Sequence, residues 1–327
     1  MRKIAGVRQE NQFQQRVVKS VTEALKQGMK TTVWLLKLTI PVSFAVLLLQ
    51  YFGILDHIAS VTAPLFKQIG LPGVAAVVLI TSIFTNIYSV VAVLTTLSMG
   101  EREGTILAVM CLVAHNLIIE TAIQKKTGSS ASRIVVVRLL GAFLIAWFLN
   151  LVLPGSFQDV SITSSQNTQS FLSVLSNWSG DIFYTIIKII VLVNLLMILQ
   201  KLMDEFKLID LLVKPFTPLM KLFGLPQNTT FLWIIANTLG LAYGGAIMIS
   251  QTEEGKLDKK DSDLLNQHIA VSHSQLEDPL LFVALGYSYF IMFFPRILLA
   301  MFFVWLRKIE LFIRKKKAEE NSPAPTI

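Results

Sequence analysis

The residues best able to do chemistry in this 327-residue chain are ionisable and lie within apolar sequence. His115 is followed by Glu120, and Arg138 lies 18 residues beyond that acid. The same types recur 158 positions later in His273, Asp278 and Arg296. Ionisable groups inside a bilayer are costly and normally face a partner or water. We expect each acid to form an ion pair with its arginine near the cytoplasmic ends of adjacent helices. The alternative is a coupling site, at which a solute or proton competes with the arginine.

The second copy of this pattern carries two additional polar groups, Gln275 and Glu277, beside Asp278. The histidines and acids together offer nitrogen and oxygen ligands suited to a divalent ion. On a continuous helix, however, His115 and Glu120 would point about 140° apart. Joint ligation therefore needs a broken helix or ligands from both copies, and we assign no metal site from the sequence.

A second group of polar residues follows the first Gly-Leu-Pro. Ser82, Thr85, Asn86 and Ser89 have the spacing of one helical face, which predicts a polar ribbon across the membrane. Amides and hydroxyls of this kind can replace the water shell of a solute, although they also stitch packed membrane helices together. The candidate solute-binding residues are Ser82, Asn86, Ser89, His115, Asn116, Asn237, Tyr243, His273 and Gln275.

No catalytic signature is evident in the sequence. The sequence contains no phosphate loop, no GxSxG elbow and no HExxH. Ser272, His273 and Asp278 are too close in sequence to define a catalytic triad without geometry. We expect neither enzymatic activity nor a cofactor.

The composition indicates an all-α integral membrane protein. Hydrophobic residues make up 53% of the chain, charged residues 15%, and the mean hydropathy is +0.61. Apolar runs of about the length that a bilayer requires occupy residues 33–52, 74–94, 134–153 and 186–200. The single cysteine, Cys111, excludes an intrachain disulfide.

Basic residues crowd the two ends of the chain, from Arg2 to Lys37 and from Arg307 to Lys317. This placement predicts that both termini face the cytoplasm, in a multi-pass protein of a bacterial-type plasma membrane. The polar loop 154–181 contains no lysine or arginine and should lie outside. No folded basic face is evident, so we expect no nucleic-acid partner.

Two segments of the chain are nearly the same. FGILDHIASVTAPLFKQIGLP (52–72) and FKLIDLLVKPFTPLMKLFGLP (206–226) agree at eight of 21 positions. The repeated helix-break residues are Asp56, Pro64, Gly70 and Pro72, and Asp210, Pro218, Gly224 and Pro226. Such interrupted apolar segments are typical of discontinuous helices in transporters, or of amphipathic helices at the membrane surface. We predict two inverted repeats of about five membrane segments each, including broken or re-entrant helices.

The predicted boundaries follow from the repeat and the charges. Residues 1–32 form a cytoplasmic amphipathic segment, on which Val17, Val21, Ala24, Leu25 and Gly28 share a face that lies on the inner membrane surface. The remaining parts are a first membrane repeat (33–153), an external polar linker (154–181), a second membrane repeat (182–308) and a basic cytoplasmic tail (309–327).

The chain resembles membrane proteins with two nucleoside-recognition, or Gate, domains. The resemblance rests on the P-x5-G-L-P segment leading to Asn86 or Asn237, and on the His-x4-acid pattern, each present twice. Related Gate units are similar to parts of ferrous-iron permeases, spore maturation proteins A and B, and concentrative nucleoside transporters. The resemblance implies a membrane fold more strongly than a substrate.

These observations predict a secondary transporter of a small polar solute, with a nucleoside or base favoured and the site between the repeats. One alternative is a membrane scaffold that transports nothing and binds a second copy or another Gate-type protein. The other alternative is a divalent metal permease of the ferrous-iron kind. The expected partners are the lipid bilayer and the small solute.

Overall fold

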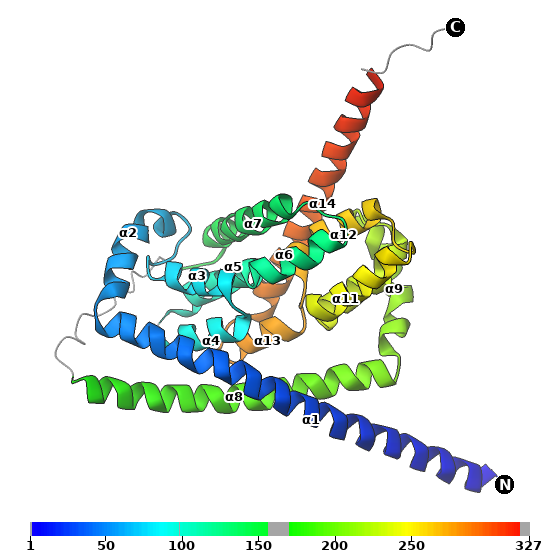
Figure 1. Cartoon of the computed structure of the whole chain (residues 1–327), viewed down its shortest axis with the longest axis horizontal. Coiled ribbons are helices and arrows are strands. Elements are labelled where there is room, and N and C mark those ends of the chain that lie inside the picture. Colours follow the sequence, from blue (N-terminus) through cyan, green and yellow to red (C-terminus); the bar gives the residue numbers. More distant parts are fainter. Residues whose placement is uncertain (1, 98, 156–169, 321–327) are drawn as a thin grey trace.

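A computed structural model describes residues 2–97, 99–155 and 170–320, and these residues form helices and no strand. The helices are α1 (Arg2–Tyr51), α2 (Ile54–Gln68), α3 (Ala75–Phe84), α4 (Ile87–Thr96), α5 (Glu101–Ala114), α6 (Leu117–Lys126), α7 (Ala131–Val152), α8 (Phe171–Glu205), α9 (Leu208–Phe223), α10 (Thr230–Thr238), α11 (Leu241–Glu253), α12 (Lys259–Ser272), α13 (Glu277–Val283) and α14 (Tyr289–Glu320) (Figure 1). A short 3₁₀ turn, Gln227–Thr229, precedes α10.

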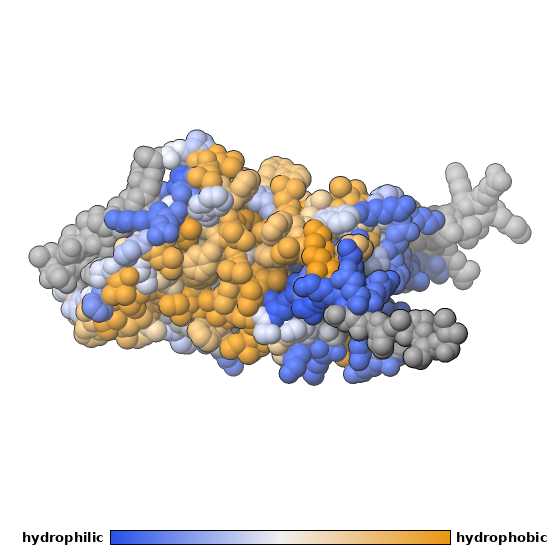
Figure 2. All heavy atoms as spheres, turned by 90° about the horizontal axis from the view of Figure 1, so that it is seen from above, coloured by the Kyte–Doolittle hydropathy of each residue, from blue (hydrophilic) through white to orange (hydrophobic). Residues whose placement is uncertain are grey.

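Within the described part of the chain, four helical stretches are long and apolar enough to cross a membrane. They are Glu101–Lys126, Ala131–Val152, Phe171–Met203 and Tyr289–Glu320. Large apolar side chains on α7, α8 and α14 are exposed, including Phe148, Leu195 and Phe302. Figure 2 shows apolar surface over the middle of the molecule and hydrophilic surface gathered toward one end. This division suits a protein whose middle is solvated by lipid tails.

The N-terminal segment differs from its expectation, because α1 is one helix of 50 residues that continues into the first apolar run. It packs along α8, where Arg16 pairs with Glu205 at 2.7 Å. Gly28 lies against Asn194 of α8, since an added Cβ would approach the amide oxygen to 2.5 Å. The sequence between the two predicted parts contains no proline to end the helix. The segment is therefore an extension of the first long helix rather than a separate helix on the membrane surface.

The two repeated segments form short amphipathic helices, α2 and α9. Their 15 and 16 residues span about 23 Å, which is less than the roughly 30 Å of a bilayer core. Gly70 and Gly224 lie at their ends with φ of 71° and 76°, a conformation that favours glycine. The helices pack against neighbouring elements, α2 on α1 and α3, and α9 on α8, α10 and α14. The structure favours the amphipathic alternative over a membrane crossing.

Four of the apolar helices are interrupted. α10 and α11 pack closely against each other. A Cβ added to Gly244 of α11 would lie 3.0 Å from the Cα of Ala236 in α10, so the chain reverses between the two helices. α3 and α4 also pack together, on either side of Thr85 and Asn86. The other interruptions separate α5 from α6 and α12 from α13 (Figure 1). The prediction of one continuous polar ribbon through residues 82–89 is therefore wrong.

Candidate functional site

The breaks at the ends of α5 and α12 place a histidine at each helix terminus. His115 is the C-cap residue that follows α5, and Asn116 comes next with φ of 50° and ψ of 34°. His273 is the C-cap of α12, and Ser274 follows with φ of 52°. A non-glycine residue rarely adopts this left-handed conformation, and asparagine does so most readily. Because each turn redirects the chain, the residues beyond it come back toward the histidine.

Two buried arginines satisfy the carbonyl groups that these helix ends leave without partners. Arg138 of α7 donates from Nε to the oxygen of Val113 at 2.8 Å and from Nη2 to the oxygen of His115 at 2.5 Å. Arg296 of α14 donates to the carbonyls of Val271 and His273, at 3.0 Å and 2.5 Å. A helix C-terminus carries partial negative charge, so a cation is favourable there. Both arginine residues are 0% exposed.

The carboxylates of the two copies are placed differently. Oε2 of Glu120 forms an ion pair with Nη1 of Arg138 at 2.7 Å, within its own half. Asp278 lies 3.4 Å from Nε2 of His115, a residue of the other half. Nη1 of Arg296 instead donates to the side chain of Gln275 at 3.4 Å. The expected pair of Asp278 and Arg296 is therefore absent within 4.0 Å in the described part of the chain.

The two histidines meet at the centre of this cluster. Their Nε2 atoms are 3.3 Å apart, and the ring centroids are 5.0 Å apart. Glu120 lies 3.4 Å from Nε2 of His115 and 3.1 Å from Nε2 of His273. Ligand-type atoms of His115, Glu120 and His273 all lie within 4.8 Å of one another. We call His115, Glu120, Arg138, His273, Asp278 and Arg296 the central cluster.

The break after His115 decides where the first acid lies. Glu120 is 6% exposed and contacts residues of both halves, so it lies within the core of the protein. On a continuous helix Glu120 would lie about 7.5 Å beyond His115 along the helix axis, whereas the break brings its carboxylate next to both histidines. The break also removes the 140° separation between His115 and Glu120.

The polar residues near the other breaks mostly satisfy the backbone. Asn86 accepts from the backbone N of Ser89 at 3.1 Å and so caps α4. Ser82 donates to the carbonyl of Cys111 at 3.2 Å. The backbone N of Asn116 donates to the carbonyls of Ser82 and Thr85. These residues hold the broken helices together, as expected for the structural alternative.

Asn237 and Gln275 lie at a small apolar cavity of about 170 Å³, which Phe216 and Phe293 also line. Asn237 donates from Nδ2 to the carbonyl of Trp233 at 2.8 Å, and its buried Oδ1 has no hydrogen-bond partner. The buried Nε2 of Gln275 also has none. These two amides remain available to a ligand in that cavity.

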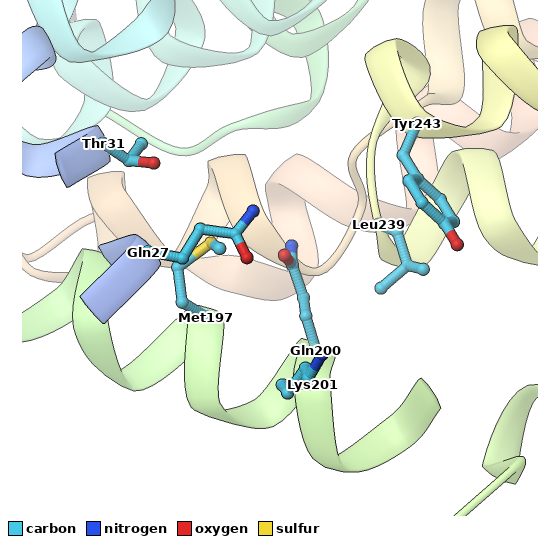
Figure 3. Close-up of a pocket in the computed structure, with 7 residues that line it drawn as sticks. All are labelled: Gln27, Thr31, Met197, Gln200, Lys201, Leu239 and Tyr243. Carbon is cyan, nitrogen blue, oxygen red and sulfur yellow. The ribbon is translucent and has the colours of Figure 1, made fainter. Parts of the chain in front are cut away.

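A larger cleft, which we call the amide cleft, opens between α1, α8 and the α10–α11 hairpin and has a volume of about 420 Å³. Its lining residues are Gln27, Thr31, Met197, Gln200, Lys201, Leu239 and Tyr243 (Figure 3). Figure 3 shows the amides of Gln27 and Gln200 near each other, with Tyr243 across the cleft. Nε2 of Gln200 donates to Glu277 at 3.2 Å, and Tyr88 donates to the other oxygen at 2.8 Å. The cleft therefore approaches the central cluster through Glu277.

A polar network that the sequence analysis missed joins the two halves at one end. Ser129 donates to Asp263 at 2.7 Å, and Arg307 pairs with the same acid at 2.7 Å. Gln124 donates to the carbonyl of Asn266 at 3.1 Å. We call this set the end network. Its sequence signal was the group of polar residues that proves to be buried in α12, namely Ser262, Asp263, Asn266, Gln267 and His268.

The repeated helix-break residues whose side chains the structure describes lie outside the central cluster and the amide cleft. Gly70 and Gly224 end α2 and α9, and Pro72 and Pro226 follow them. Pro64 and Pro218 lie inside those helices, and Asp210 lines a separate small cavity with Lys207. Asp56 belongs to α2 as well. Their common role is to shape the two amphipathic helices.

Comparison with known proteins agrees with this architecture. A family model described as Gate, nucleoside recognition, matches residues 32–143, nearly the same range as the first predicted repeat. The uncharacterized membrane protein YvoD of Bacillus subtilis (strain 168) is 30% identical over 266 residues, which cover 80% of this chain and 85% of that protein. No solved structure matches significantly. The chain is thus an all-α, multi-pass membrane protein that belongs to the Gate-domain family of YvoD.

Proposed function

We propose that this protein is a secondary transporter of a small polar solute, built from two inverted halves. The supporting pattern is the order of elements: a long helix, a short amphipathic helix, a hairpin, a broken helix and a second long helix occur in α1–α7 and again in α8–α14. Two helical stretches of each half are long and apolar enough to cross the membrane, and we propose that α1 in the first half and the broken helix α12–α13 in the second add a third crossing to each. An odd number of crossings inverts the second half, as in many secondary transporters. In this arrangement both termini face the cytoplasm of a plasma membrane.

The observation that carries the proposal is the central cluster. It consists of ionisable groups at most 6% exposed, and each half contributes a histidine, an acid and an arginine. Burying such groups costs free energy, and in membrane proteins they mark pathways and coupling sites. Broken helices that converge from two repeats are the usual framework of a transport site. A movement of one half against the other would alter every contact between His115, His273 and their acids.

The amide cleft is the proposed solute site. Its volume lies within the range of about 300–1,000 Å³ that is common for ligand pockets. The side-chain amides of Gln27 and Gln200 can pair with the edge of a base, and Tyr243 offers a stacking face. A nucleoside or base is therefore the favoured solute, in keeping with the matched family model.

One observation favours the scaffold alternative. His115 and His273 touch each other, and no solute fits between two ring nitrogens 3.3 Å apart. A scaffold would keep these residues packed permanently and would present its surface to a second copy or another Gate-type membrane protein. A transporter must separate them during its cycle.

A thermal-shift screen of the purified full chain separates these functions. We expect one class among nucleosides, bases and amino acids to raise the unfolding temperature of the parent, because a ligand of the folded state stabilises it. Gln200→Ala and Tyr243→Ala should lose that shift. The control Gln68→Ala removes an exposed amide on α2 and should show the same ligand-induced shift as the parent. If no compound shifts the parent, or if the cleft variants respond as the parent does, the proposed solute site is wrong.

A further inference from the structure

We propose that the central cluster is a binding site for a divalent first-row transition-metal ion, shared by the two halves. The ligands are Nε2 of His115, Nε2 of His273 and the carboxylate of Glu120, and Oδ2 of Asp278 lies nearby, 3.4 Å from Nε2 of His115. Two imidazoles with carboxylates suit zinc, iron, cobalt or manganese better than calcium or magnesium. The proposal does not depend on solute transport.

The hydrogen bonds of the two histidines point their free nitrogens at each other. Nδ1 of His273 lies 2.8 Å from the carbonyl of Ile269, and Nδ1 of His115 lies 3.1 Å from the carbonyl of Leu112. A carbonyl only accepts, so each Nδ1 carries a hydrogen, and a ring in its neutral form then presents a lone pair at Nε2. Metal-binding histidines are typically oriented by this kind of bond from the second nitrogen.

With both rings neutral, the atoms that face one another at the centre of the cluster are therefore all hydrogen-bond acceptors, and no donor lies between them. The facing atoms are the two Nε2 atoms, the Glu120 oxygens and Oδ2 of Asp278, and this last oxygen has no hydrogen-bond partner. Lone pairs in contact repel one another, and a buried acceptor without a partner destabilises the fold. A cation at the centre would turn each of these contacts into an attraction.

The spacing of the three ligand groups His115, Glu120 and His273 suits tetrahedral coordination with one further position. Ligands about 2.0–2.1 Å from a tetrahedral ion lie about 3.3–3.4 Å from one another. The separation of the two Nε2 atoms is 3.3 Å. Oε1 of Glu120 lies 3.4 Å from Nε2 of His115, and Oε2 of the same carboxylate lies 3.1 Å from Nε2 of His273. These separations are close to those of ligands around one ion.

The arginines orient this site and balance its charge. Arg138 holds one oxygen of Glu120 at 2.7 Å, an outer partner of the kind that ligating carboxylates have. Glu120, Glu277 and Asp278 supply three carboxylates against the guanidinium groups of Arg138 and Arg296. If these five groups are ionised, the buried set has one negative charge to spare for a cation. Because both halves supply ligands, binding of the ion favours the arrangement in which the halves are closed.

The site is tested with Co²⁺ and Zn²⁺ on the purified full chain after treatment with a chelator. We expect one Co²⁺ per chain, with the intense visible absorption of tetrahedral nitrogen and oxygen ligation, and displacement of that ion by Zn²⁺. His273→Gln and Glu120→Gln should weaken binding at least about tenfold, since each removes a ligand. The control His57→Ala removes an exposed histidine on α2 and should bind as the parent does.

A second readout needs no variant and so does not depend on a variant folding. Pulsed electron paramagnetic resonance of the parent loaded with Cu²⁺ should show two bound imidazoles. Weak binding that is equal in the parent, His273→Gln and Glu120→Gln overturns the proposal. Absence of saturable binding also overturns it and indicates that a proton alone occupies the cluster. Neither result bears on the solute screen, so the transport proposal and the metal site can fail separately.

Discussion

The coupling energy between Arg138 and Glu120 should be larger than that between Arg296 and Asp278, the corresponding residues of the second half. Arg138 donates to two carbonyls and pairs with Glu120 at 2.7 Å. Arg296 makes the same two carbonyl contacts but has no acid within 4.0 Å in the described chain. Removing one partner of a buried pair costs about 3–5 kcal/mol. We therefore expect Arg138→Gln to destabilise the protein by about that amount.

Double-mutant cycles isolate the pairwise contribution, measured by equilibrium unfolding in mixed detergent micelles with a chelator present. For Arg138→Gln with Glu120→Gln we predict a coupling of about 1–3 kcal/mol, in the range found for contacting residues. The matched cycle of Arg296→Gln with Asp278→Asn should give a value smaller by about 1 kcal/mol or more. Equal couplings, or a larger one in the second cycle, would refute the asymmetry described here.

Three further outcomes are expected. Asn116→Gly should leave the unfolding temperature nearly unchanged, whereas Asn116→Val should lower stability by about 1–2 kcal/mol, because φ is positive there. Gly73→Ala should cost about 1–3 kcal/mol in the same unfolding assay, since its Cβ would meet the carbonyl oxygen of Ala59 at 2.0 Å; a neutral result would contradict this packing. Single cysteines at Gln14 and Ser173, with buried Cys111 left in place, should be labelled from opposite sides of the membrane in intact and permeabilised cells. Labelling of both from one side would contradict the inverted arrangement.

Much of the helical framework follows from the sequence, because it depends on local pattern. The runs 33–52, 134–153 and 186–200 all lie in long helices. An apolar run of that length must satisfy its backbone hydrogen bonds internally in a bilayer, and a helix does so. The pairing of the two His-acid-Arg patterns was also visible from their common spacing. The sequence did not show that the two histidines touch, because that contact depends on tertiary packing.

The helix breaks were the main feature that local pattern did not reveal. Residues 74–94 and 101–126 are apolar enough to propagate a helix, yet both stretches are interrupted. The break after His115 is stabilised by groups distant in sequence, above all Arg138, and by bonds from Asn116 to α3 and the turn that follows it. Helix propensity is weak compared with such tertiary contacts, which can override it. The amide cleft was missed for the same reason, since Gln27 and Gln200 become neighbours only when α1 packs on α8.

The central claim is that the two halves separate and close around the central cluster, and a distance between them tests it most directly. Spin labels at Ser130→Cys and Lys256→Cys, in a Cys111→Ala background, would report on the end that the end network holds together. We predict two populated distances in lipid nanodiscs, with their ratio changed by Asp263→Asn, which weakens that network. A single narrow distance between the labels would contradict transport and favour the scaffold, if neither Asp263→Asn nor any stabilising ligand of the screen changes it.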